Sequence, residues 1–206
     1  TEYPEKWHLC EITNPDGRSG GIPEALTGAD AVISLAEPGP GTIKEEWIAG
    51  MAPKAIVFAC ANPIPEIWPW EAKRAGAAIF ATGRSDFPNQ VNNSLCFPGI
   101  FRGALDVRST TITDEMCFAA ADALAGFGIE DLGPERILPS MEDWELFPKV
   151  AAAVGMEAQR NGVARIPHTE DELFLAAERM ISRSRRITKE MMEMKLIADP
   201  PQEDGE

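Results

Sequence analysis

Three short apolar runs alternate with helix-forming stretches in the first hundred residues. The runs lie at residues 31–35, 55–59 and 77–81. They lack the polar alternation of a strand with one wet face, so they are typical of parallel strands that are covered on both faces. Parallel neighbours need a crossover connection, which the intervening helical segments supply. The sequence therefore predicts an α/β protein with a parallel sheet.

Three strands are fewer than the roughly five or six of a complete doubly wound sheet. A Gly-x-Gly-x-x-Gly pattern after a strand is also missing, since Gly17, Gly20 and Gly21 have neither the spacing nor the context. We therefore expect a partial doubly wound, Rossmann-like sheet, with its first half encoded before residue 1.

Beyond Thr110 the pattern becomes helical. Thr113 is placed to cap one helix, and Thr169 with Glu172 forms a capping box for another, as Thr42 with Glu45 does earlier in the chain. We expect residues 111–198 to be helices that pack on the sheet domain. The acidic, proline-containing segment 199–206 is expected to be a disordered tail.

Charge and composition exclude several classes of function. The formal net charge of −14 argues against a nucleic-acid partner, because phosphate neutralisation needs clustered Lys and Arg. No apolar run reaches the roughly 20 residues that span a bilayer, so no membrane partner is expected. The four cysteines have no paired two-residue spacing, which argues against zinc and favours reduced thiols in a cytoplasmic protein.

The polar stretch at residues 82–93 follows the third strand and precedes a predicted helix over residues 94–107. It is dense in amide side chains, which donate and accept hydrogen bonds at once. In open α/β sheets, ligands bind outside the carboxyl ends of the strands. The stretch therefore predicts a small-molecule site. Within it, Arg84 and Asp86 are expected to pair with each other rather than with a ligand.

Two asparagines stand out at the strand ends, and each has a structural alternative. Asn62 ends the second strand before a proline, which favours an extended backbone with the amide projecting past the sheet. Taken alone, it fits a turn-stabilising asparagine better. Asn93 lies at a helix start, where it would serve as an N-cap, a role that Asn92 or Ser94 could fill equally.

Several longer motifs in order resemble the malic enzymes. Asn-Gln-Val-Asn-Asn at residues 89–93 is followed by Phe-Pro-Gly-Ile-Phe-Arg-Gly-Ala-Leu at 97–105. Upstream, Phe-Ala-Cys-Ala-Asn-Pro-Ile-Pro-Glu-Ile at 58–67 resembles the Asn-Pro turn of that family. The resemblance covers about residues 20–165. It implies that residues 1–110 form the second half of a dinucleotide-binding domain.

The resemblance also implies site residues. Asn62 would contact malate and the nicotinamide end of the cofactor, and Asn93 would bind malate. Ala36 and Glu37 lie in the loop that matches the family's cofactor loop, and Asn92 is expected on the cofactor side as well. This loop is longer than the Ser-Ala-Pro-Gly of many bacterial members. Its Glu37 would favour NAD if it faced a ribose, so NAD and NADP both stay open.

The family reaction is the oxidative decarboxylation of malate to pyruvate and carbon dioxide, with NAD or NADP reduced and Mg or Mn as the metal. In the family, the lysine base, the tyrosine acid and the metal-binding carboxylates precede the aligned part. We therefore assign no catalytic residue and no metal ligand here, and we expect the chain alone to be inactive. The intact protein is expected to be a homo-oligomer, a dimer. The alternative is a non-catalytic cofactor-binding or oligomerisation module that lacks the catalytic half.

Overall fold

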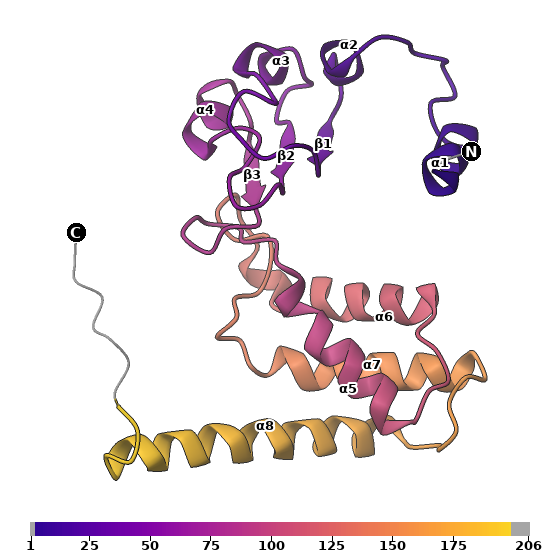
Figure 1. Ribbon diagram of the computed structural model, residues 1–206, viewed down its shortest axis with the longest axis vertical. Helices are drawn as coiled ribbons and strands as arrows, with labels where there is room; N and C mark the ends of the chain where they lie inside the picture. Colours follow the sequence, from indigo (N-terminus) through magenta and orange to yellow (C-terminus); the bar gives the residue numbers. More distant parts are fainter. Residues whose placement is uncertain (1–2, 199–206) are drawn as a thin grey trace. The chain divides into compact units, whose positions relative to one another are not determined.

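The computed structural model describes residues 3–198 and divides the chain into two compact units (Figure 1). The first unit runs up to Asn92 and includes Gly133–Ile137 from further along the chain. Its elements are α1 (Pro4–Ile12), α2 (Ile22–Leu26), β1 (Ala31–Ser34), α3 (Glu45–Ala49), β2 (Ile56–Ala59), α4 (Pro69–Arg74) and β3 (Ile79–Thr82).

The first unit contains the predicted parallel sheet. Among the described residues it has three strands in the order β1-β2-β3, and Figure 1 shows their arrows side by side and pointing the same way. Val32 pairs with Val57, which in turn pairs with Phe80. Because all strands run in parallel, their carboxyl ends meet at one edge, where the loops after each strand begin. The predicted partial doubly wound α/β fold is confirmed.

One face of the sheet carries the core of this unit. Val57 and Phe80 are buried there against Ile48, Ile67 and Ala72 of the adjoining helices and loops. The expectation that all strands are covered on both faces is wrong for the first run. Within its unit Ile33 is 70% exposed and Leu35 78% exposed. Among the described strands β1 lies at one edge of the sheet and β3 at the other. Ile33 and Leu35 alternate with Val32 onto the side away from the core cluster.

The chain departs from two other helix expectations in this unit. The capping box of Thr42 and Glu45 is wrong: α3 begins at Glu45 with Lys44 as N-cap, and the Thr42 hydroxyl donates to the Glu37 carbonyl over 3.2 Å. Helix α1 was not predicted. Its apolar residues do not form a buried stripe, since Trp7 and Ile12 are exposed, so the helical period carries no signal there.

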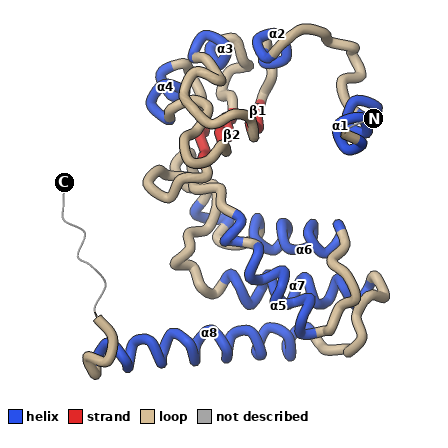
Figure 2. The backbone as a smooth tube through the Cα atoms, viewed as in Figure 1, coloured by secondary structure: helices blue, strands red, loops and turns tan. Residues whose placement is uncertain are grey.

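The second unit is helical. Figure 2 shows the blue helices of this unit, in contrast to the short red strands of the first. Helix α7 is its centre, with Val150, Val154 and Ala158 fully buried and α5, α6 and α8 packed around it. The elements are η1 (Asn93–Leu95), α5 (Phe97–Asp106), α6 (Asp114–Ala125), η2 (Ile129–Asp131), α7 (Leu146–Arg160) and α8 (Glu170–Glu193).

Two of the predicted helix starts are confirmed in this unit. The Met116 amide donates to the Thr113 hydroxyl over 3.3 Å at the start of α6. At the start of α8, the Glu172 amide donates to Thr169 Oγ1 over 3.2 Å, and the Thr169 amide donates back to Glu172 over 2.9 Å. The division of the chain at residue 110 stays a prediction. The compact units separate at Asn92–Asn93, because α5 packs extensively against α7. The tail 199–206 lies outside the described residues.

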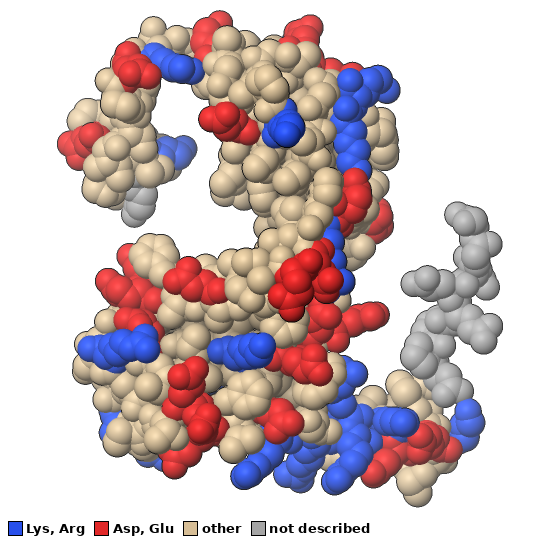
Figure 3. Space-filling view, turned by 180° about the vertical axis from the view of Figure 1, so that it is seen from behind, with Lys and Arg blue, Asp and Glu red and all other residues tan. Residues whose placement is uncertain are grey.

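Helix α8 carries five of the chain's nineteen Lys and Arg residues. Figure 3 shows Lys and Arg side chains gathered along it. Two of these cations pair along the helix, Arg186 with Glu190 and Lys189 with Glu193. Within residues 3–198, no helix combines the length and the apolar character needed to cross a membrane. The basic residues of the cluster are Arg179, Arg183, Arg185, Arg186 and Lys189.

The packing of α5 on α7 depends on glycines that allow a close approach. A Cβ at Gly103 would contact the carbonyl oxygen of Ala151 and would lie 2.8 Å from Val154 Cβ and 2.9 Å from the Gly155 nitrogen. Two of these three atoms are backbone, so they cannot move aside without shifting the helix. The pattern Gly99-Ile-Phe-Arg-Gly103 therefore places its glycines for helix packing.

We predict that Gly103→Ala destabilises the second unit by about 1–3 kcal/mol through overpacking. This exceeds the gain of up to about 1 kcal/mol that alanine brings to a helix interior. Urea denaturation followed by circular dichroism measures the change. Gly133→Ala is the matched control, because a Cβ there meets nothing within 4 Å and the residue does not need a left-handed backbone. Equal stability of the two variants would contradict the close-packing account.

Candidate functional site

The loops after β1 and β2 place three of the predicted site residues at one edge of the sheet. Ala36 and Glu37 follow β1, and Asn62 follows β2, and all three are exposed. The two strands are hydrogen-bonded neighbours up to the point where the loops begin, with the Cys60 amide donating to the Ser34 carbonyl over 3.0 Å. The structure therefore brings these three residues to the same carboxyl edge, as the sequence predicted for parallel strands.

A buried carboxylate, Glu66, joins these two loops. Its side chain is 0% exposed. Oε1 accepts a hydrogen bond from the Ala36 amide over 2.8 Å, and Oε2 accepts one from the Ala61 amide over 3.0 Å. A carboxylate removed from water must be compensated by such bonds, and bonds to an ionised acceptor are among the strong ones. Glu66 is not among the predicted site residues, although a single acid within an otherwise apolar Pro-Ile-Pro-Glu-Ile segment is a usable signal.

The backbone around Asn62 is held on both sides. Its preceding residue, Ala61, donates its amide to Glu66. Its following residue, Pro63, accepts a hydrogen bond from Arg84 Nη1 over 3.2 Å, and the Asn62–Pro63 peptide bond is cis. The Asn62 side chain is thus carried on a restrained turn while it faces solvent, which is the arrangement expected of a group that meets a ligand.

Arg84 pairs with Asp86, as predicted. Nε donates to Oδ1 over 2.8 Å and Nη2 to Oδ2 over 2.6 Å, a bidentate geometry. The hydrogen bonds from Arg84 lower the pKa of Asp86, and those to Asp86 raise the pKa of Arg84. Because the pKa of Asp86 is lowered in the folded state, the pair is present above the ordinary carboxyl pKa and is lost as the pH falls through the lowered value.

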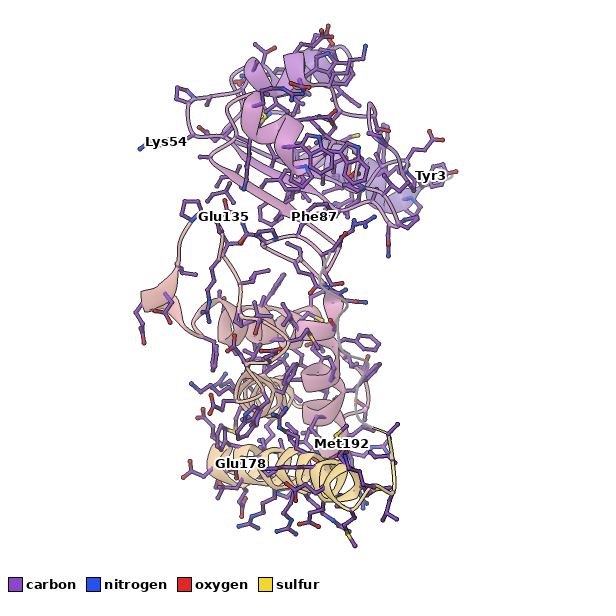
Figure 4. All side chains as sticks on the ribbon, turned by 90° about the vertical axis from the view of Figure 1, so that its left-hand side faces the viewer. Tyr3, Lys54, Phe87, Glu135, Glu178 and Met192 are labelled. Atoms are coloured by element: carbon purple, nitrogen blue, oxygen red, sulfur yellow. The ribbon has the colours of Figure 1, made fainter. Side chains whose placement is uncertain are left out.

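An aromatic cluster that is not among the predicted site residues lies beside Arg84. Trp68 and Trp70 stack with their ring centroids 4.9 Å apart, and Phe87 meets both edge-on at 6.3 and 6.2 Å. The Arg84 guanidinium lies 5.6 Å from the Phe87 ring centre and 6.0 Å from that of Trp68. Figure 4 labels Phe87 on the loop after β3. The cluster connects the loop after β2 with the loop after β3.

Asn89 fastens the loop after β3 to the rest of the first unit. Its Nδ2 donates to the carbonyls of Phe80 (2.9 Å) and Pro134 (2.7 Å), and its Oδ1 accepts from the Ile137 amide over 2.9 Å. The residue is buried and has a left-handed backbone (φ 57°), which asparagine tolerates better than most residues. Asn89 therefore ties segment 133–137, distant in sequence, to strand β3.

The remaining two predicted residues lie in sequence on either side of the boundary between the two units. Asn92 is the last residue of the first unit and is half-buried. Asn93 belongs to the second unit, where it is exposed and begins η1. It does not cap α5, whose N-cap is Cys96. The roles of Ala36, Glu37, Asn62, Asn92 and Asn93 toward substrate or cofactor stay predictions.

Metal chemistry finds no counterpart in this part of the molecule. Within residues 3–198 no group of three or more His, Cys, Asp or Glu side chains could hold a metal ion. The resemblance likewise implies that the carboxylates which would hold Mg or Mn lie outside these residues.

Burial, together with the nearby Glu66 carboxylate, raises the pKa of Cys60, so this thiol next to Ala61 stays protonated at neutral pH.

Comparison with known proteins gives one consistent result. Residues 31–159 match the family model for the malic enzyme, NAD binding domain. The chain is 45% identical over 169 residues to the bifunctional malic/malolactic enzyme of Bacillus subtilis (strain 168), covering 82% of this chain and 41% of that protein. It is 47% identical over 165 residues to the NAD-dependent malic enzyme of Geobacillus stearothermophilus, covering 80% and 34%.

The same similarity holds in three dimensions. The crystal structure of the Entamoeba histolytica malic enzyme matches with a TM-score of 0.94 and 51% identity, covering 98% of this chain and 42% of that one. The chain thus spans about two fifths of the length of that protein and of the Bacillus relative.

We predict that Asn89→Asp releases segment 133–137 and destabilises the first unit by about 2–3 kcal/mol. Aspartate keeps the left-handed backbone and the acceptor for Ile137, but it removes the donor to two buried carbonyls and sets a carboxylate against them. Hydrogen exchange of the Ile137 amide and thermal unfolding measure the effect. Asn161→Asp is the control, because Asn161 makes an exposed side-chain bond to Thr113. Unchanged exchange at Ile137 would contradict the fastening role.

Proposed function

The chain belongs to the malic enzymes, through their NAD-binding domain, and we propose that it supplies the nicotinamide-nucleotide face of such an enzyme. The reaction is the oxidative decarboxylation of malate to pyruvate and carbon dioxide, with NAD or NADP as the hydride acceptor. The observation that carries this proposal is the match of the NAD-binding domain to residues 31–159, a span that includes the whole carboxyl edge of the sheet.

The exposed groups at that edge suit the proposed ligands. The Asn62 amide can donate to a malate oxygen and accept from the nicotinamide carboxamide, because an asparagine side chain does both. The exposed Glu37 carboxylate can accept hydrogen bonds from ribose hydroxyls, which favours NAD over NADP, since a 2′-phosphate would meet a like charge. Asn93 is assigned to malate and Asn92 to the cofactor side. When bound, the nucleotide supplies the acceptor for the hydride that leaves malate.

The contribution of these residues to the reaction is to position the reactants. Ala36, Glu37 and Asn62 bind and orient the nucleotide and the substrate, and the close placement of the two reactants is the main contribution of such groups to the rate. No proton transfer is assigned to a residue of this chain. The base, the acid and the metal ligands are attributed to parts of the protein outside the residues matched here.

We also propose a cytoplasmic homodimer. The homodimer is what the resemblance to the malic enzymes implies for the natural gene product. The free thiols of Cys10, Cys60, Cys96 and Cys117 suit a reducing compartment. Light scattering of the natural gene product tests the dimer, and a monomer across the micromolar range would contradict it.

In the natural gene product, Asn62→Ala and Asn93→Ala should each lower kcat/KM for malate by roughly ten- to a hundredfold. This is the cost of one hydrogen bond to a charged group. Steady-state reduction of NAD and NADP with malate as the varied substrate measures it. Asn161→Ala, at the exposed end of α7, is the control. If the gene product reduces neither nucleotide with malate, the proposed activity is wrong, and the chain is a non-catalytic binding module.

The 206 residues on their own should not oxidise malate and should bind NAD or NADP only weakly. The pyrophosphate of a dinucleotide normally rests on a glycine-rich loop at a helix N-terminus, and this sequence has no Gly-x-Gly-x-x-Gly after a strand. Calorimetric titration of the purified chain with each nucleotide is the measurement. Micromolar affinity, or measurable turnover of malate, would overturn this expectation.

A further inference from the structure

The ladder of backbone hydrogen bonds between β1 and β2 ends where the Glu66 side chain contacts the two strand ends. The last backbone bond along the two strands runs from the Cys60 amide to the Ser34 carbonyl over 3.0 Å. In a parallel ladder the next donor would be the amide of Ala36, pointing toward β2. That amide instead donates to Glu66 Oε1, and the Ala61 amide donates to Oε2 of the same carboxylate. The carboxylate is therefore inserted between the two strand ends.

This insertion sets the width of the opening between the loops. Ala36 and Ala61 are joined through one rigid planar group. Their backbones are therefore held apart by the span of a carboxylate, so they can neither form a direct hydrogen bond nor separate further. Both amides thereby have a hydrogen-bond partner, which the buried Ala61 in particular requires. The two residues directly beyond them, Glu37 and Asn62, are the exposed groups assigned above to the nucleotide and the substrate.

The backbone of Glu66 holds the other end of the first loop. Its carbonyl oxygen accepts hydrogen bonds from the amides of Gly41 and Ile43, each over 3.1 Å. Segment 36–43 is thus anchored at its start by the side chain of Glu66 and near its end by the main chain of the same residue. The Gly39 amide adds a bond to the Ile64 carbonyl over 3.3 Å. The whole loop after β1 is attached to the segment that follows Asn62.

We propose that Glu66 is a positioning residue of this site: its carboxylate holds the loops after β1 and β2 open at a fixed spacing in which Glu37 and Asn62 meet the bound nucleotide together. The identity of the ligand rests on the proposed function, whereas the clasp, meaning the two hydrogen bonds from the Ala36 and Ala61 amides to the Glu66 carboxylate, does not. A free loop would have to be ordered when the nucleotide binds, which weakens binding, whereas a loop that is already held costs less.

The first test is hydrogen exchange on the 206-residue chain with Glu66→Gln. Glutamine has the same shape, but only one of its terminal atoms accepts, and the other is a donor that faces a second donor. The Ala36 or the Ala61 amide should then exchange roughly tenfold faster or more. Glu71→Gln is the matched control: Glu71 also accepts a backbone amide, from Trp68 over 3.1 Å, but at the start of α4 and not between the ends of β1 and β2.

The second test separates positioning from stability in the natural gene product. Glu66→Gln should raise the dissociation constant and the KM of NAD(P) roughly tenfold, with kcat at saturation changed by less, because a bound nucleotide re-orders the loops. Glu71→Gln should leave the KM unchanged even if it lowers the melting temperature. Nucleotide affinity is measured by calorimetry, so this reading does not require turnover.

The outcomes are distinct. Unchanged exchange at both Ala36 and Ala61 in Glu66→Gln overturns the clasp. Faster exchange with unchanged nucleotide affinity also overturns the proposal, because the spacing then does not matter to the ligand. Faster exchange with weaker nucleotide binding supports it. Absence of malate oxidation in the unsubstituted gene product refutes the proposed function alone, since exchange and calorimetry still decide on Glu66.

Discussion

The two hydrogen bonds to the buried carboxylate of Glu66 are the contact on which the geometry of the strand ends depends. They replace the backbone hydrogen bonds of the sheet where β1 and β2 separate. They connect Glu66 to Ala36, 30 positions earlier in the sequence, and to Ala61, five positions earlier. Removing a carboxylate from water is costly, so the bonds that compensate it also fix its position. The carboxylate thereby joins the starts of two loops that main-chain bonds from Gly39, Gly41 and Ile43 already connect further along.

The neighbouring contacts extend this restraint along the same edge. Arg84 reaches from the loop after β3 to the Pro63 carbonyl and is itself held by Asp86 and the aromatic cluster of Trp68, Trp70 and Phe87. Asn62 therefore lies between a bond to its preceding residue and a bond to its following one. Rigid placement of exposed polar groups on the strand ends is what a nucleotide-binding face requires, and the match to the NAD-binding domain of malic enzymes agrees with it.

Much of the fold could be predicted because it rests on local patterns. The apolar runs at residues 31–35, 55–59 and 77–81 correspond to β1, β2 and β3 of the predicted parallel sheet, and the caps at Thr113 and Thr169 formed. Predictions failed where long-range contacts decide. Thr42 lost its capping role because α3 begins only at Glu45, and the exposure of Ile33 depends on which elements cover β1.

The candidate site divides in the same way. The location at the strand ends follows from the parallel order of the strands, and the Arg84–Asp86 pair from two residues of sequence separation. The partners of Glu66 and Asn89 did not follow, because each side chain reaches backbone groups of segments that only the tertiary fold brings near. A buried glutamate or asparagine carries no periodic signal, so its role is visible only once its hydrogen bonds are known.

The central claim, that the carboxyl edge of this sheet faces the nicotinamide nucleotide, is tested most directly by nuclear magnetic resonance of the isotope-labelled chain titrated with NADH at millimolar concentration. Even weak binding shifts the resonances of residues at the contact. We predict that the amides of Ala36, Glu37, Ala61 and Asn62 shift with increasing NADH, whereas those of Gly28 and Gly76, which precede β1 and β3 at the opposite edge, stay in place. Shifts at Gly28 and Gly76 with none at Ala36 and Asn62 would contradict the account.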